Sequence, residues 1–518
     1  MPQESANPPP MRDTAGPILV REFQFVGNTL LNTPVLAEVT QPWLNRHLQF
    51  SQLQEAANAV AAAYRSTGWV VRAYLPRQEI IDGIVRIQIV EARFGKVRIE
   101  AASALRHHDA TPIAAFAEQD QIQGQPLNAK ALDRALLLLG DLPGLEAVGS
   151  LTQGQQQAES DLVLTITDKP LWTGDVGTDN TGSRSTGAAR LFANLALNSP
   201  WGRLDQGQAN LASTQGSDFL RLAYFFPIRS NGLRAGASAS LLKYHLVGAD
   251  FEALGARGDS STYGLEFSFP ALRSRDANVY LTGALDYKAF NNLSANATTS
   301  NYHTTAVTLG VNGNQRDSVS GINGGLTQAS FNLTVGDVDL RDSPNQAGDT
   351  ATTQVAGSYY KLRYSLSRQQ PLLQQWSLLA SWSGQVAGKN LDSSEKFYLG
   401  GSSGLRAYPS GEAGGSDGHM VNIELRWSLS SNVALTGFYD WGAVTVNHNN
   451  DFPGNAPRNH LLLQGSGLVL GWNSERGTNA KITWSRRVGE NPNPGASGND
   501  QDGSLVTDRV WLLVSATF

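Results

Sequence analysis

Cysteine is absent from this sequence of 518 residues, which excludes disulfides and thiolate metal sites. Long hydrophobic runs are absent too: no stretch of about 18 apolar residues occurs, so no transmembrane helix is expected. Residues 1–5 lack the basic and apolar segments of a signal peptide. The formal net charge is −5, and this lack of basic excess gives no reason to expect nucleic acid as a partner.

Glycine is abundant, with 52 residues, and apolar residues make up 41% of the chain against 16% charged residues. Such a composition indicates a folded protein rich in strands and turns, not a disordered one. The mean hydropathy is −0.26. A negative value is compatible with a transmembrane β-barrel, because half of the residues in each barrel strand are polar and face inward.

The first third predicts a disordered leader over residues 1–16 and two small α+β units over residues 17–92 and 93–168. In the first unit, apolar residues recur at helical spacing from Leu53 to Tyr64, with Ser51 as a possible N-cap and Gly68 as the stop. The second unit predicts helices over residues 111–118 and after Pro126, followed by strands near residues 145–151 and 161–167.

Two stretches of the first unit carry a family resemblance. Phe25-Val26-Gly27-Asn28-Thr29 and, after Gly68-Trp69, Arg72-Ala73-Tyr74-Leu75-Pro76 resemble the first POTRA (polypeptide-transport-associated) domain of two-partner secretion transporters. Residues 93–168 are similar to the second POTRA domain by their pattern. The resemblance implies that both domains lie in the periplasm and bind an unfolded partner exoprotein through a strand edge and an apolar groove. The residues that carry the motif are Gly27, Asn28, Gly68, Arg72, Leu75 and Pro76.

Residues 169–518 predict a 16-stranded antiparallel transmembrane β-barrel. Strand-like segments alternate, as where Val421, Ile423 and Leu425 face away from Asn422 and Glu424. A soluble sandwich would alternate in the same way, but the links differ, because those after even strands are short and several after odd strands are long. This asymmetry is typical of outer-membrane barrels, and an even strand count places both barrel ends on the periplasmic side. The long links are expected at about residues 246–261, 291–302, 337–357, 387–418, 446–459 and 489–507.

The last predicted strand ends on the aromatic residue Phe518. This ending resembles the signal by which outer-membrane barrels are recognised for insertion. The resemblance implies that barrel assembly machinery acts on the chain during biogenesis and that outer-membrane lipid surrounds the finished barrel.

The long link at residues 387–418 contains the motif Leu405-Arg406-Ala407-Tyr408, which resembles the Val-Arg-Gly-Tyr motif of the family's inward-folded loop. Phe438 and Asp440 match the Phe-x-Asp motif of a nearby strand, where parity places both side chains inward. A bidentate Arg406–Asp440 contact would fix the loop in the lumen, and Glu424 is a second possible partner. Ala407 stands where the family has Gly, and a positive φ there would strain an alanine.

A further match lies at the start of the barrel. Residues 179–183, with Thr186, Gly187 and Arg190, resemble the family's first hairpin, but their residue types do not indicate a function.

Catalysis is not expected from this sequence. Gly400-Gly401-Ser402-Ser403-Gly404 satisfies the pattern G-x-S-x-G, but a nucleophile elbow needs a strand–turn–helix context and the flanks here predict loop. The eight histidines show no metal-ligand spacing, and no phosphate-binding loop is present, so neither metal nor cofactor is expected.

The chain is therefore identified as a member of the two-partner secretion transporter (TpsB) family. The resemblance implies an outer-membrane pore that recognises an unfolded partner exoprotein through its POTRA domains and moves it to the cell surface. Two alternatives stay open: a barrel assembly or insertion factor of the same superfamily, and a diffusive porin. The exoprotein could be an adhesin, a cytolysin, a haem-acquisition protein or a contact-dependent toxin, and no N-terminal plug helix is evident.

Overall fold

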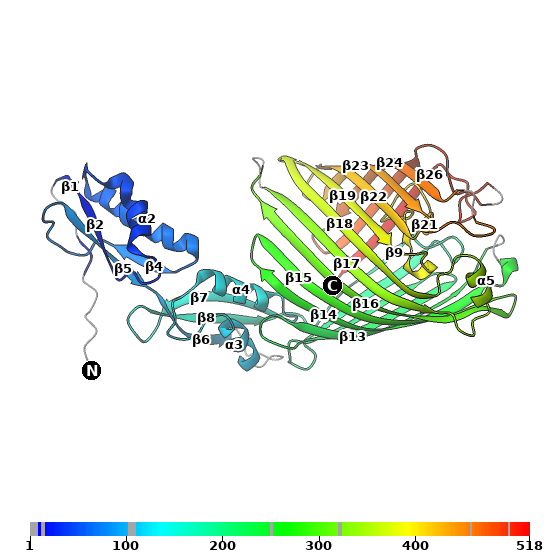
Figure 1. Cartoon of the computed structure of the whole chain (residues 1–518), viewed down its shortest axis with the longest axis horizontal. Coiled ribbons are helices and arrows are strands. Elements are labelled where there is room, and N and C mark those ends of the chain that lie inside the picture. The colour runs from blue at the N-terminus through cyan, green and yellow to red at the C-terminus, as the bar shows by residue number, and fades with distance from the viewer. Residues whose placement is uncertain are drawn as a thin grey trace. The chain divides into compact units, whose positions relative to one another are not determined.

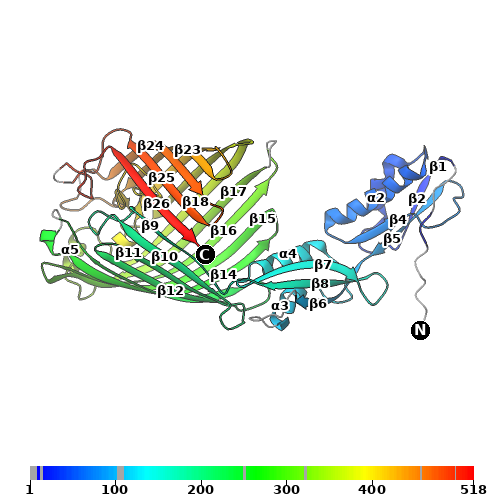
Figure 2. The same cartoon turned by 180° about the vertical axis from the view of Figure 1, so that it is seen from behind.

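The computed structural model describes residues 9–11, 16–101, 110–248, 252–319, 324–455, 458–495 and 498–518. The chain divides into two compact units, Met1–Lys169 and Pro170–Phe518 (Figures 1 and 2). The leader predicted for residues 1–16 lies for the most part outside the described residues. No helix among the described residues is long and apolar enough to cross a membrane.

The first unit begins with a small α+β domain. Its elements are β1 (Ile18–Val20), β2 (Glu22–Val26), α1 (Thr33–Thr40), the 3-10 helix η1 (Gln41–Trp43), β3 (Arg46–Leu48), α2 (Phe50–Thr67), β4 (Val71–Tyr74) and β5 (Ile84–Glu91). Strands β2, β5 and β4 form one sheet, and β1 pairs with β3. The apolar face of α2, including Leu53, Val60 and Tyr64, is fully buried in the domain core.

The predicted ends of α2 are half right. The helix begins with a capping box between Gln49 and Gln52, so Ser51 is not its N-cap. Glutamine can replace the usual short polar N-cap residue here, because the side chains of Gln49 and Gln52 both accept hydrogen bonds from backbone N–H groups at the start of the helix. The predicted stop is correct: Gly68 has φ +96° and donates its N–H to Arg65 and Tyr64 carbonyls.

A second α+β domain completes the first unit. It consists of β6 (Arg93–Ala101), α3 (Ala110–Glu118), α4 (Ala129–Gly140), β7 (Leu145–Gln153) and β8 (Glu159–Asp168). The sheet order is β6-β8-β7, with β6 parallel to β8. Asn128 caps α4, because its side-chain oxygen accepts the N–H groups of Lys130 and Ala131. The apolar side of α4, with Leu132 and Leu139, is buried.

The second unit is a closed antiparallel barrel, as predicted, and within the described residues it contains sixteen strands (Figure 1). They are β9 (Trp172–Asp179), β10 (Arg190–Asn198), β11 (Gln206–Ser213), β12 (Ser217–Pro227), β13 (Arg234–His245), β14 (Arg257–Arg273), β15 (Ala277–Ser294), β16 (Ala297–Asp317), β17 (Gly325–Asp339), β18 (Gly357–Leu373), β19 (Trp376–Ala387), β22 (Asp417–Ser428), β23 (Val433–Thr445), β24 (His460–Asn473), β25 (Thr478–Arg487) and β26 (Asp508–Thr517). The barrel closes where β26 pairs with β9.

The links of the barrel differ between its two rims. Short ones, such as residues 274–276 and 374–375, follow even strands, whereas the link 340–356 with helix α5 (Gln346–Ala351) follows an odd strand. One expected long link is wrong. Residues 291–302 are not a loop, because β15 and β16 continue through them to a two-residue turn at Ala295 and Asn296, which both have positive φ.

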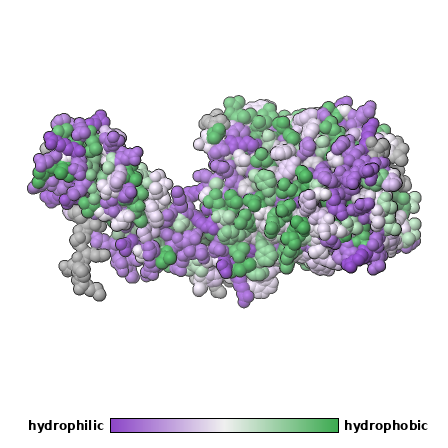
Figure 3. All heavy atoms as spheres, viewed as in Figure 1, coloured by the Kyte–Doolittle hydropathy of each residue, from purple (hydrophilic) through white to green (hydrophobic). Residues whose placement is uncertain are grey.

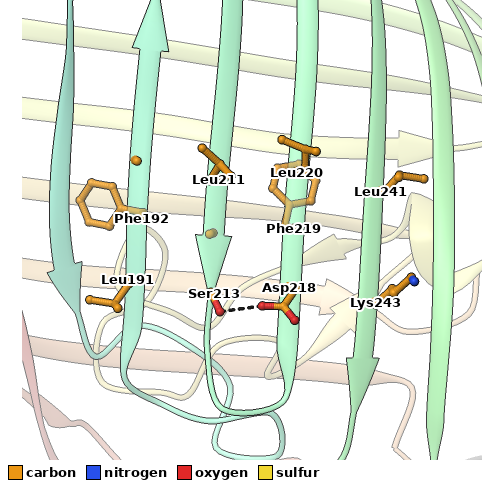
Figure 4. Close-up of a pocket in the computed structure, with 11 residues that line it drawn as sticks. Leu191, Phe192, Leu211, Ser213, Asp218, Phe219, Leu220, Leu241 and Lys243 are labelled. Atoms are coloured by element: carbon orange, nitrogen blue, oxygen red, sulfur yellow. Dashed lines mark hydrogen bonds between the residues drawn. The ribbon is translucent and has the colours of Figure 1, made fainter.

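Side chains on the outer wall of the barrel are mainly apolar. Leu191, Leu211 and Leu241 of neighbouring strands are 66%, 42% and 51% exposed and line one hollow of that wall (Figure 4). Figure 3 shows hydrophobic residues gathered over the strands and hydrophilic residues dominating towards the end that carries the long links. Outward apolar side chains suit contact with lipid acyl chains, whereas inward positions are free to be polar.

Candidate functional site

The link between β19 and β22, residues 388–416, folds against the inner face of the barrel wall and is called the lumen loop here. It contains the 3-10 helix η3 (Ser393–Glu395) and the short strands β20 (Phe397–Tyr398) and β21 (Gly414–Gly415), which pair with each other. Leu405 and Tyr408 are fully buried in a cluster with Val444 and Leu463 of the wall. A Gly-rich loop is costly to order, and this burial helps to offset that cost.

Arg406 meets the predicted acidic partner. Its Nε and Nη2 donate to Asp440 at 3.0 and 2.6 Å, and its backbone N–H donates to the same carboxylate at 3.0 Å. Nη1 donates to Glu424 at 2.8 Å, so the second predicted partner is also in place. The guanidinium carbon lies 3.5 Å from the ring centroid of Phe438. Asp440 and Glu424 come from β23 and β22, so one loop residue joins two neighbouring strands.

The two carboxylates have further partners. Asn422 donates to Asp440 at 2.8 Å, and Arg426 donates to Glu424 at 2.7 Å. Asp440 is 0% exposed and Arg406 is 8% exposed. A buried ion pair of this kind adds little net stability, but breaking it by removing one partner costs about 3–5 kcal/mol, because a buried charge is left alone. The contact therefore fixes geometry more than it adds stability.

The carbonyl oxygen of Arg406 is held as well. It accepts hydrogen bonds from Ser485 Oγ at 2.6 Å and from Trp511 Nε1 at 2.7 Å. These residues belong to β25 and β26, which the sequence reasoning did not connect with the loop. The sequence showed only that their side chains point inward. It did not identify them as partners of a loop residue about 80 or 100 residues away, because strand tilt and stagger decide which residues of separate strands lie at the same height in the barrel.

Ala407 adopts no strained conformation, since it is not among the residues with positive φ. It is fully buried, and its Cβ lies against Gly465 of β24. A Cβ added to Gly465 would come within 2.6 Å of the Cβ of Ala407. The departure from the family's Gly at 407 is therefore matched by a glycine on the facing strand.

The tip of the lumen loop also contacts two surface links. Glu412 accepts hydrogen bonds from Asn493 at 3.1 Å and from the N–H of Gln501 at 3.0 Å, both in link 488–507. Burial raises the pKa of Glu412, although these donors oppose that rise. Ser410 donates to the carbonyl of Thr181 in the first hairpin at 3.0 Å.

The first hairpin, whose function the sequence did not indicate, is held by an ion pair. Arg190 donates to Asp179 at 2.7 Å, and the Asp179 side chain is fully buried. Thr181 adds its N–H and its hydroxyl to the same carboxylate at 2.9 and 2.6 Å. The pair fixes the conformation of the hairpin that Ser410 contacts.

The predicted POTRA residues hold the first domain together. Gly27 has φ +88°, and a Cβ there would lie 2.3 Å from the carbonyl oxygen of Ile89. Asn28 donates to the carbonyl of Leu31 at 3.1 Å within the same turn. Leu75 is 2% exposed in the core, and Arg72 lies over the ring of Tyr74. Pro76 forms an isolated bridge with Pro10.

Glu91 is a POTRA residue that the sequence reasoning missed. Its carboxylate accepts the N–H groups of Thr29 and Leu30 at 2.7 and 2.9 Å, the hydroxyl of Thr29, and the hydroxyl of Tyr64 at 3.0 Å. Burial works against ionisation, but these donors outweigh it and hold the pKa of Glu91 below its usual range. Burial, followed by the Glu91 carboxylate, raises the pKa of Tyr64.

Comparisons with other proteins show the family of the chain. The sequence profile of the haemolysin secretion/activation proteins ShlB/FhaC/HecB matches residues 158–471, more than half of the chain. The chain belongs to this family. A ShlB-type POTRA profile matches residues 18–92. Members of the TpsB family are outer-membrane transporters that secrete partner proteins, and their POTRA domains lie in the periplasm.

Two groups of relatives cover most of this TpsB chain. The heme/hemopexin transporter protein HuxB of Haemophilus influenzae is 27% identical over 85% of this chain and 78% of its own length. The outer membrane transporter CdiB of Dickeya dadantii is 26% identical over 83% of this chain and 77% of its own. The structure of CdiB from Escherichia coli, at 20% identity, covers 100% of this chain and 93% of its own, with a TM-score of 0.73. The last likeness shows the shared fold.

Proposed function

We propose that this TpsB transporter captures one unfolded exoprotein in the periplasm and passes it through the barrel, with the lumen loop moving to open the path. The observation that carries the proposal is the Arg406 clasp, defined as Arg406 with Asp440, Glu424, Ser485 and Trp511. The clasp joins the lumen loop to strands β22, β23, β25 and β26. A polypeptide needs the space that the loop occupies, so the clasp controls the width of the path.

The POTRA domains supply the capture surface in this proposal. Strand β7 pairs with β8 on one side, and in the described sheet β6-β8-β7 it is an edge strand. Its side chains Val148 and Leu151 are 61% and 45% exposed. An unfolded chain can add a strand to such an edge through backbone hydrogen bonds and place apolar side chains beside Val148 on one face of the sheet and beside Leu151 on the other.

We expect no chemical step on the client. The G-x-S-x-G stretch at residues 400–404 lies between β20 and β21 of the lumen loop, and not between a strand and a helix as a nucleophile elbow requires. Barrel assembly machinery as a partner in biogenesis, and lipid around the outer wall, remain part of the proposal. The support for lipid contact is the apolar outer wall.

Secretion of a co-expressed partner exoprotein tests the proposal with the variants Arg406→Ala and Asp440→Ala. Both are expected to insert normally, as judged by heat-modifiable mobility, and to lose secretion, since each leaves a buried charge without its main partner. Arg486→Ala is the matched control, because Arg486 pairs with Asp508 at 3.8 Å in an exposed contact. Exposed pairs contribute about 0–1 kcal/mol, so the control should secrete like the wild type.

Wild-type secretion by both clasp variants would remove the Arg406 clasp from the mechanism. If the protein inserts barrel proteins into the membrane and does not deliver one exoprotein to the surface, it is an assembly factor. A large conductance in the intact wild type that does not depend on a partner would point to a porin.

A further inference from the structure

A second charged cluster lies on the inner barrel wall, against residues 391–396 of the lumen loop. This part of the loop is called the first limb here. Glu395, the last residue of η3, accepts hydrogen bonds from Lys288 Nζ at 2.7 Å and Lys361 Nζ at 2.5 Å. Lys288 belongs to β15 and Lys361 to β18. Glu395 is 3% exposed and Lys361 is 4% exposed, so this contact is as well buried as the Arg406 clasp.

The main chain at Glu395 is held along with its side chain. Its carbonyl oxygen accepts hydrogen bonds from Lys361 Nζ at 2.9 Å and from Gln385 Nε2 at 3.2 Å. Arg363 of β18 donates to the next carbonyl, that of Lys396, at 3.0 Å. Wall residues from three strands, β15, β18 and β19, therefore converge on two adjacent loop residues.

A hydrophobic contact lies beside this charged cluster. Leu391 of the lumen loop is 2% exposed and packs in a buried cluster with Tyr302, Tyr359 and Ala387 of the wall. The hydroxyl of Tyr302 donates to Asp392 at 3.2 Å, and Asp392 also caps η3 by accepting the N–H of Ser394. The limb from Leu391 to Lys396 thus has its own hydrophobic contact, its own helix cap and its own ion pairs.

The two attachments of the lumen loop use different strands. The Arg406 clasp uses β22, β23, β25 and β26, whereas the contacts of Glu395 and Lys396 use β15, β18 and β19. None of the contacts described for one attachment shares a side chain with the other. The two limbs also meet each other, where β20 pairs with β21 and where Ser416 Oγ accepts the N–H of Leu391, so release of one limb alone must open these contacts as well.

We propose that Glu395 is a positioning residue for transport, which with Lys288 and Lys361 forms a second clasp that opens independently of the Arg406 clasp. This inference rests on the proposed function, in which the lumen loop must move. Three wall cations, Lys288, Lys361 and Arg363, face the Glu395 carboxylate, and Asp286 of β15 interacts with Lys288 as well. When Glu395 lifts with the limb, it uncovers three wall cations that have Asp286 as a nearby carboxylate, so the open wall is positive.

Such a positive wall would favour acidic segments of the client at the moment of entry, since unlike charges attract. The second clasp thereby couples loop release to the chemistry of the passing chain. The Arg406 clasp behaves differently, because its wall side carries the two carboxylates Asp440 and Glu424. The two clasps leave opposite charges on the wall when they open.

The absence of cysteine from the natural sequence allows a direct test by single-cysteine labelling of the full chain in lipid vesicles. Ala387→Cys reports on the first limb, because Ala387 is 3% exposed under Leu391. Val444→Cys reports on the limb that carries Arg406, because Val444 is 2% exposed under Leu405 and Tyr408 and is not part of the clasp. Each reporter is labelled with a soluble maleimide, and each rate is compared with that of the same reporter in the otherwise unchanged chain.

With Glu395→Gln, labelling at 387 is expected to rise about tenfold or more, while labelling at 444 stays within about twofold, as for independent local opening. Arg406→Ala should give the reverse pattern. Glu395→Asp keeps the charge and should restore slow labelling at 387. Asp508→Asn, which removes a carboxylate from an exposed pair, is the matched control and should change neither rate.

Unchanged labelling at 387 in Glu395→Gln would overturn the second clasp, and a joint rise at both reporters would overturn its independence. If Glu395→Gln fails to show heat-modifiable mobility, Lys288→Met tests the same contact from its more exposed side, where the Lys288 side chain is 26% exposed. The labelling pattern does not require secretion. Normal secretion by Arg406→Ala together with the expected pattern would therefore reject the proposed function and keep the second clasp.

Discussion

Ala407 and Gly465 share one small space between the lumen loop and β24. An added Cβ on Gly465 would come within 2.6 Å of the Ala407 Cβ, a separation too short for two carbon atoms. Whichever of the two positions carries the methyl group, the other must be glycine. Ala407 of this chain is thus accommodated by the glycine at position 465.

Gly465→Ala is expected to displace the lumen loop, because overpacking of this kind costs about 1–3 kcal/mol. Ala407→Gly alone should be mild, since it removes one methyl group and adds backbone freedom worth about 0.5–1 kcal/mol. The double variant, Ala407→Gly with Gly465→Ala, should recover the wild-type behaviour. The measurement is trypsin cleavage of the folded chain in the lumen loop, where Lys389, Lys396 and Arg406 are the cleavage sites.

A double variant that is cleaved as fast as Gly465→Ala would contradict this shared-space account. In that case the remaining contact of the added Cβ, with the carbonyl oxygen of Arg486 at 3.3 Å, would be the cause.

At the scale of elements, the turn after β2 is fixed by the end of β5. Glu91 at the end of β5 accepts two backbone N–H groups of the turn, at Thr29 and Leu30, and a hydroxyl from Tyr64 of α2. One carboxylate therefore joins a turn, a strand and a helix of the first POTRA domain. Gly27 permits the close approach, because its positive φ and missing Cβ let the turn pass the carbonyl of Ile89.

The stability of this turn should depend on pH. The pKa of Glu91 is lowered in the folded protein from an ordinary value of 4.5, so its contribution is fully present above that value. It is lost as the pH falls through the ordinary value towards the lowered one. Hydrogen exchange of the Thr29 and Leu30 amides in the full chain measures this loss. The exchange is followed from neutral pH down through pH 4.5 and then below it.

Glu91→Gln is the matched variant, because glutamine keeps the shape but not the charge. It should exchange faster at neutral pH by the loss of charge-assisted hydrogen bonds worth about 1.5–3 kcal/mol, and its protection should no longer vary across the carboxyl range. The same pH dependence in Glu91→Gln and the wild type would show that another group is responsible.

The hairpin of β15 and β16 shows a limit of sequence patterns at the same scale. The residues around its turn, 291–302, are rich in Asn, Ser and Thr, and these residue types predicted a loop. The structure continues both strands there: β15 pairs with β14 as far as Leu293 and with β16 to its end, whereas residues 297–302 of β16 pair with β15 alone. Polar residues are tolerated in these extensions, since they lie where the wall no longer needs apolar side chains.

At the scale of the whole barrel, the outer and inner faces carry different side chains. Leu265 of β14 is 48% exposed and pairs across with Leu285 of β15, which is 44% exposed. Thr262, three residues earlier, has the opposite parity and faces the lumen. An alternating strand of a closed barrel presents these two positions to different solvents, lipid on one side and the lumen on the other.

Leu265→Arg should lower the free energy of unfolding from lipid vesicles by about 2–4 kcal/mol, the cost of a cation on the lipid face near the middle of the membrane. Ala284→Arg is the matched control and should cost much less, because Ala284 of β15 faces the polar lumen, directly opposite Glu266 of β14. Denaturant unfolding of both variants in vesicles gives the comparison. Equal costs would contradict the assignment of the two faces.

The sequence by itself determined the barrel, the two α+β domains and the residues of the Arg406–Asp440 contact. Alternation and link length are local properties, and a strand must show them wherever its partners lie. Parity on a strand placed Glu424 and Phe438 on the inward face, and the resemblance to the family's Phe-x-Asp motif singled out Phe438 and Asp440 among the inward residues.

Only the tertiary structure decided which distant residues meet in the lumen. Ser485, Trp511, Gly465 and Glu395 reach the lumen loop or its wall because barrel closure, stagger and tilt bring particular levels of separate strands together. No local pattern contains that register. A buried loop also selects its contacts as a set, so Ala407 depends on a glycine in another strand and Glu395 on lysines in two others.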